Sequence, residues 1–139
     1  MQFKKTNSSY FLRIDKGEEI ISSIENITVD ENIQSGAIVG IGALTEVTLG
    51  YFDRKQKKYL RRTFNDIYEM LSFSGNISYL DDKPIVHAHV ILGQPDYTLI
   101  GGHLFSGVVA VTGEVYIQTF KDKFNRQLNP EFDLNLLAF

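Results

Sequence analysis

Three histidines in one short stretch are the side chains whose types and spacing most clearly predict chemistry. His87 and His89 are separated by one residue, and His103 follows in the next strand-like segment. Because side chains alternate between the two faces of a strand, His87 and His89 are expected on the same side. Three converging neutral imidazoles leave a fourth position open for water, as in catalytic or labile zinc sites. Zinc, nickel, copper and iron all accept such ligands.

Polar packing is the alternative interpretation of the same histidines. A lone histidine is usually a surface or hydrogen-bonded residue, and unrelated histidines would scatter along the chain. Here all three occupy residues 87–103. A His-x-His pair on a strand indicates a metal, and the third histidine strengthens that indication. Both metal ligation and polar packing therefore remain open at the level of the residues.

Two glutamates are candidate catalytic residues beside such a site. Glu69 and Glu114 each lie inside an apolar, strand-like run. An inward carboxylate could orient a ligand histidine, ligate the metal or act as a general base. The alternative is that each side chain points outward into solvent.

A hairpin is needed to bring the histidines together. Residues 85–92 and 97–104 have strand character, and Gly93-Gln94-Pro95-Asp96 between them is typical of a turn. If the two segments pair, His103 arrives beside His87 and His89.

The rest of the chain predicts an α+β fold, with a mostly antiparallel multi-stranded sheet and one main helix. Ile20, Ile21, Ile24 and Ile27 form a helical stripe, with Glu18 and Glu19 expected in its first turn. Repeated strand patterns follow, and no linker interrupts them, so residues 1–139 are expected to be a single domain. The other strand-like segments are residues 10–15, 36–44, 47–52, 59–64, 69–78, 108–120 and 134–139.

Composition excludes several classes of function. The chain has no cysteine, which removes disulfides, thiolate metal sites and cysteine nucleophiles. It shows no secretory signal pattern and no apolar run long enough to span a membrane, so a cytoplasmic location is expected. Fourteen Lys and Arg against seventeen Asp and Glu give a net charge of −3, which disfavours binding to nucleic acid in general.

One basic run is the only local phosphate surface that the sequence offers. Arg54, Lys55, Lys57 and Lys58 lie close together, so they are candidate nucleic-acid-binding residues. Such a run is more often a solvated hairpin turn.

Several motifs, in order, resemble the plant-and-prokaryote-conserved (PPC) domain, a family of unknown function, over about residues 10–137. The resemblance is to the stand-alone prokaryotic form and is carried by runs in both halves of the chain. They are Gly40-Ile41-Gly42-Ala43-Leu44, Val47–Phe52, Tyr68–Ile77, Pro84–Val90, Gly101-Gly102-His103-Leu104 and Thr112-Gly113-Glu114-Val115.

The resemblance implies an antiparallel sheet fold that assembles as a homotrimer. It also implies that His87, His89 and His103 are ligands of a transition metal, with zinc the first choice. Prokaryotic members carry a DNA-binding label, whereas in plants the domain follows AT-hook motifs, and this chain has no Arg-Gly-Arg-Pro core. The glutamate of the plant Gly-Arg-Phe-Glu-Ile-Leu run matches Glu69, but its Gly-Arg pair is missing here.

Two functional hypotheses follow. The first is a self-associating, trimeric regulatory or interaction module, associated with DNA or with a regulatory protein partner, that carries the three-histidine site and is not an enzyme. The second is a metal-dependent enzyme or small-molecule binder with hydrolase or lyase chemistry, in which the metal activates a water.

Overall fold

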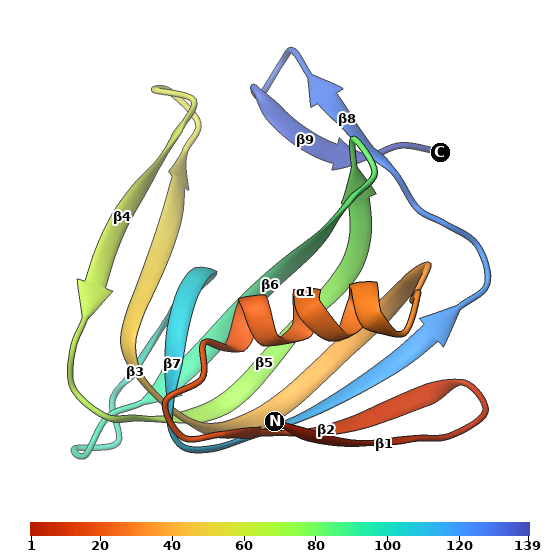
Figure 1. The fold of residues 1–139 in the computed structure, drawn as a ribbon. Coiled ribbons are helices and arrows are strands. Elements are labelled where there is room, and N and C mark those ends of the chain that lie inside the picture. The colour runs from red at the N-terminus through yellow and green to blue at the C-terminus, as the bar shows by residue number, and fades with distance from the viewer.

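Nine strands and one helix make up the computed structural model, which describes residues 1–139 (Figure 1). The helix is α1 (Ile20–Asp30). The strands are β1 (Gln2–Lys5), β2 (Ser9–Asp15), β3 (Ser35–Asp53), β4 (Lys58–Phe64), β5 (Tyr68–Leu80), β6 (Lys83–Gly93), β7 (Leu99–Phe120), β8 (Arg126–Asn129) and β9 (Leu134–Leu137). The expected combination of one helix with an antiparallel sheet is confirmed, and strands make up most of the chain.

Seven strands form one antiparallel sheet in the order β1-β2-β7-β6-β5-β3-β4. β7 also pairs with β3, so the sheet closes on itself through β3, β5, β6 and β7. β8 and β9 form a separate hairpin that stands above the end of the main sheet (Figure 1).

The two longest strands each join segments that the sequence predicted as separate. β3 runs through both 36–44 and 47–52, with a bulge between Gly40 and Gly42 in its pairing with β5 and positive φ at Glu46. β7 likewise joins two predicted segments, residues 97–104 and residues 108–120, into one strand. Tyr97 itself lies in the turn before this strand, with φ 64°. A bulge bends a strand without ending its pairing. Glycine and polar residues in the sequence therefore look like turns between separate strands, although the strands continue through them. β1 and β8 were not predicted.

The helix stripe is confirmed, but the expected acidic first turn is not. α1 begins at Ile20, so Glu18 and Glu19 precede it. Glu19 is instead the N-cap: its carboxylate accepts hydrogen bonds from the backbone N–H groups of Ile21 (3.1 Å) and Ser22 (2.7 Å). Ile20, Ile24 and Ile27 are buried in a continuous core of 23 residues.

The main sheet has two faces of different character. Along β6, Val86, Ala88 and Val90 are buried in the core beneath α1, while His87 and His89 point to the opposite, outer face. This alternation puts both histidines on the side of the sheet that the helix does not cover. The single helix is too short and too polar to cross a membrane.

Candidate metal centre

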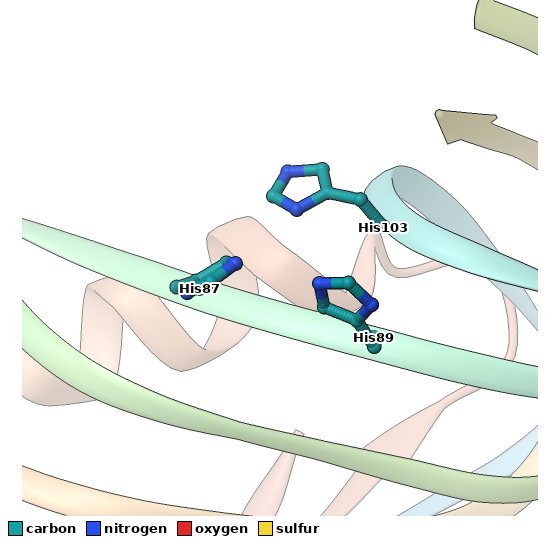
Figure 2. Close-up of side chains that lie close together, drawn as sticks. All are labelled: His87, His89 and His103. Carbon is teal, nitrogen blue, oxygen red and sulfur yellow. The ribbon is translucent and has the colours of Figure 1, made fainter. Parts of the chain in front are cut away.

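His87, His89 and His103 come together on the outer face of the sheet (Figure 2). β6 and β7 pair as the expected hairpin, and His89 lies directly opposite His103 in the register. One ligand nitrogen from each ring lies within 4.8 Å of the others, and the ring centroids are 5.1–5.4 Å apart. The three side chains therefore meet within one chain, and no second subunit is needed to assemble the cluster.

The environment keeps two of the three imidazoles neutral. Burial lowers the pKa of His87 to about 4, and the nearby positive charge of Arg126 adds to the effect. Burial also lowers the pKa of His103 to about 4, with further contributions from His87, His89, Arg61 and Arg126. Neutral imidazole is the form that binds a metal, so both side chains are ready to act as ligands at pH 7.

A buried nitrogen without a partner supports the fit of a metal to this cluster. The Nδ1 atom of His103 is inaccessible to solvent and has no hydrogen-bond partner. Leaving such an atom unsatisfied costs about 1–3 kcal/mol. Tetrahedral zinc with Zn–N bonds of about 2.0–2.1 Å needs ligand nitrogens roughly 3.4 Å apart, and the three nitrogens here already lie within 4.8 Å of one another.

Aromatic side chains form one wall of the cluster. Tyr59 and Phe105 lie with ring centroids 4.8 Å and 4.6 Å from the His103 ring, and Arg61 stacks over Phe105 at 3.7 Å. Gly50, opposite His103 on β3, makes this arrangement possible, because a Cβ there would lie 2.5 Å from Phe105 Cε2.

Arg126 and the β8–β9 hairpin form the facing wall. A pocket of about 240 Å³ lies between the hairpin and the sheet, and Tyr59, His87, His103 and Arg126 are among its lining residues. Arg126 donates hydrogen bonds from Nε to Ser78 Oγ (2.7 Å), from Nη2 to Asn76 Oδ1 (2.9 Å) and from Nη1 to the carbonyl oxygen of Asn135 (2.9 Å). It thereby ties the hairpin to β5 beside His87, which pairs with Asn76.

The structure does not bring the two candidate glutamates into the histidine cluster. Glu69 pairs with Gly93, so it lies four residues along the hairpin from His89, or roughly 13 Å of strand. Glu114 lies eleven residues beyond His103 on β7, or roughly 36 Å of strand. Both side chains are exposed, and the only group of potential metal ligands in the chain is the three histidines.

The basic run occupies the exposed turn between β3 and β4. Arg54 stacks over Phe132 with its guanidinium carbon 5.8 Å from the ring centre, and Lys57 Nζ lies 3.4 Å from the carbonyl oxygen of Pro130. Both contacts reach the turn between β8 and β9. The run is therefore partly engaged in holding the two hairpins together.

Arg126, Tyr59 and Asn76 are site residues that the sequence did not indicate. Tyr59 and Asn76 lie in predicted strands, but nothing local shows which face they occupy. Arg126 is 48 and 50 residues from its partners Ser78 and Asn76. The positive charge of Arg126 was visible in the sequence, but its place beside the histidines depends on the tertiary fold.

The fold and the cluster define a class: a closed antiparallel sheet that carries a three-histidine candidate metal centre on its outer face. The Plants and Prokaryotes Conserved (PCC) domain model matches residues 1–121, and the chain belongs to this family. The resemblance inferred from the sequence motifs, to the same family under its PPC name, is confirmed. No protein of curated function matches the chain significantly.

Solved structures of similar proteins agree with this assignment. A candidate DNA-binding protein from Bacteroides thetaiotaomicron is 33% identical, with 99% of this chain and 96% of that chain covered and a TM-score of 0.96. A metal-containing protein from Archaeoglobus fulgidus is 32% identical, with 100% and 99% covered and a TM-score of 0.89. A PPC protein from Pyrococcus horikoshii is 33% identical, with 99% and 95% covered and a TM-score of 0.88.

The lowered pKa values predict how the metal-free protein titrates. We expect His87 and His103 to stay neutral at pH 6 and to take up protons only near pH 4, whereas the unfolded chain takes them up near 6.5. Because the unfolded state then binds more protons, the free energy of unfolding should fall as the pH drops from about 6.5 to 4. Histidine NMR shifts and urea denaturation across this range measure both effects. Titration of both rings near pH 6.5 would contradict the burial argument.

Proposed function

We propose that this protein binds a transition metal ion, zinc first, through His87, His89 and His103. The observation that carries the proposal is the convergence of three imidazole nitrogens within 4.8 Å on one sheet face. The unpartnered Nδ1 of His103 and the neutral state of His87 and His103 support it. A similar structure, from Archaeoglobus fulgidus, is of a metal-containing protein.

The three-histidine set suits zinc with one open position. When bound, such an ion supplies a Lewis acid and lowers the pKa of a coordinated water toward about 7. This chemistry supports the second hypothesis, a metal-dependent hydrolase or lyase or a binder of small molecules. The pocket beside His87 and His103 is the specific feature that favours it, because it gives a ligand access to the cluster. In this setting the side chains around the cluster, rather than Glu69 or Glu114, would contact the ligand.

Removal of two ligands tests the metal proposal. Protein purified without an affinity tag should hold about one equivalent of metal, measured by inductively coupled plasma mass spectrometry. The His87→Ala/His89→Ala variant should lose it. Loss of a residue that only orients a ligand costs about 10–100-fold in metal affinity, so loss of two ligands should cost more than ~100-fold.

A double variant at the two exposed glutamates is the matched control. Glu69→Gln/Glu114→Gln should keep the full metal content, because neither carboxylate lies in the cluster. Stoichiometric metal in the histidine variant, or no metal in the unaltered protein even after reconstitution, would refute the proposal.

We further propose that the protein self-associates through its outer apolar face, as a homotrimer. Phe11, Tyr116 and Val39 lie in one row across β2, β7 and β3, and the rings of Phe11 and Tyr116 are 4.9 Å apart. Ile41 and Leu71 extend this row into a groove of about 760 Å³. Contiguous exposed apolar side chains of this kind are typical of an interface with another protein. We define these five residues as the outer apolar patch.

A charge placed in the outer apolar patch should break the assembly. Val39 is 52% exposed within the patch, and Val29 is 61% exposed on α1, away from it. Light scattering of the unaltered protein should give three times the 15.8 kDa mass of one chain. Val39→Glu should shift the mass to one chain at micromolar concentration, while Val29→Glu should leave the trimer intact. A monomeric unaltered protein would exclude self-association at this concentration.

Contact with DNA is proposed from the relatives, and contact with a regulatory protein from the family resemblance. The similar protein from Bacteroides thetaiotaomicron is a candidate DNA-binding protein, and so is one from Ralstonia eutropha that is 28% identical. The exposed Arg54, Lys55, Lys57 and Lys58 are the cationic surface that a duplex could use. Such a role would place the protein in the cytoplasm.

Charge reversal tests the DNA proposal. Lys55→Glu/Lys57→Glu/Lys58→Glu should weaken duplex binding at low salt. For three lost phosphate contacts, the magnitude of the slope of log K against log salt should fall by about 2.7. The matched control Lys16→Glu/Lys83→Glu/Lys121→Glu carries the same change in net charge on exposed positions elsewhere. Equal loss in both variants would make the effect one of net charge, and no binding by the unaltered protein would exclude the proposal.

A further inference from the structure

Arg126 carries a positive charge that no side chain of the protein neutralises. It is partly buried, and its three hydrogen bonds go to a hydroxyl, an amide oxygen and a backbone carbonyl. None of the ion pairs of the chain includes it. Because removing a cation from water without a counter-charge is costly, this position is suited to an anion that arrives from outside.

The Arg126 guanidinium also has N–H donors that make no hydrogen bond within the protein. A guanidinium has five N–H groups. Three of these N–H groups donate hydrogen bonds: Nε to Ser78, Nη1 to Asn135 and Nη2 to Asn76. One N–H group on Nη1 and one on Nη2 therefore remain without a partner in the protein. A pair of N–H groups on the two terminal nitrogens matches the two oxygens of a carboxylate, the usual bidentate partner of arginine.

The charges around the pocket have one sign. Arg126 lines the pocket together with His87 and His103, and Arg61 lies behind His103 on the Phe105 ring. Three neutral imidazoles would leave both positive charges of a bound divalent ion uncompensated. An anionic ligand would therefore be attracted by the metal position and by Arg126 together.

The size and walls of the pocket restrict the rest of the ligand. Its volume of about 240 Å³ is below the roughly 300–1,000 Å³ that drug-sized ligands occupy. Apart from the polar groups already named, the walls are mostly aliphatic. The aliphatic side chains on the outer face that line the pocket are Leu80, Ile85, Leu134 and Leu136. A short carbon chain fits this lining better than a sugar or a second charged group.

We propose that this pocket binds a small aliphatic carboxylic acid, with its carboxylate between Arg126 and the metal position and its carbon chain against Leu134 and Leu136. The inference rests on the proposed metal function, because it assigns a ligand class to that site. Arg126 then acts as the residue that recognises and positions the carboxylate.

Calorimetric titration of the zinc-loaded protein with butyrate tests the inference. Arg126→Gln should weaken butyrate binding by roughly 10-fold or more, because a charge-assisted bidentate contact is lost. Lys121→Gln, which removes one exposed cation outside the pocket, should change it less than about 2-fold. Leu134→Trp keeps Arg126 but narrows the pocket, so it should also weaken binding. Amide NMR shifts of the unaltered protein on adding butyrate should concentrate at Tyr59, His87 and residues 134–136.

Metal content measured on the same samples separates the two proposals. Protein that holds zinc but does not bind butyrate would overturn the ligand assignment and leave the metal site intact. Protein that cannot hold zinc would overturn the proposed function and, with it, this inference. Phosphate binding tighter than butyrate binding would overturn the carboxylate class, and unchanged affinity in Arg126→Gln would overturn the role of Arg126.

Discussion

The register of β7 is the constraint on which the rest of the structure depends. This strand hydrogen-bonds to β2, β6 and β3, so its alignment fixes the closure of the sheet as well as the position of His103 opposite His89. Side chains repeat with a period of two along a strand, so a slip of one residue would turn His103 into the core and Leu104 out to solvent. The buried apolar side chains of β7 resist such a slip because they belong to the core; they include Leu104, Val109, Val115 and Ile117. The core therefore holds the histidine in place without contacting any metal.

The two faces of the sheet contribute differently to stability, which explains why the folded chain can keep an unfavourable cluster of polar groups. α1 and the inner face of the sheet bury a core of 23 residues, which supplies the hydrophobic stabilisation. On the outer face, His103 keeps an unpartnered nitrogen and Arg126 keeps an uncompensated charge. Each costs stability in the folded protein. Buried groups that remain unsatisfied are often found where a ligand supplies the missing interaction.

The sequence was sufficient for the parts of the site that depend on local pattern. The turn at residues 93–96 and the strict alternation of His87, Ala88 and His89 fixed both the pairing and the face, so the cluster could be predicted. The glutamates follow the same alternation. Glu69 lies between the buried Tyr68 and Met70, and Glu114 lies between the buried Gly113 and Val115, so both are exposed, as the alternative interpretation of these residues expected. Their distance from the histidines could not be predicted, because it depends on the strand pairing and on the bulges in β5 and β7. The place of Arg126 in the site could not be predicted from the sequence, because its partners Ser78 and Asn76 lie 48 and 50 residues earlier in the chain.

The β8–β9 hairpin is a small element that changes the surroundings of the candidate metal centre. Without it, the three histidines would lie on an open sheet face, where water would surround the ligand position and screen the cationic side chains. The hairpin lies beyond the residues that the family model matches, yet it contributes Arg126, Leu134 and Leu136 to the pocket. By lowering the local dielectric it strengthens every charge interaction inside the pocket, and by adding an arginine it sets the sign of the charge that the pocket favours. The sheet thus carries the three histidines that we propose as metal ligands, while the hairpin limits which molecules can reach them.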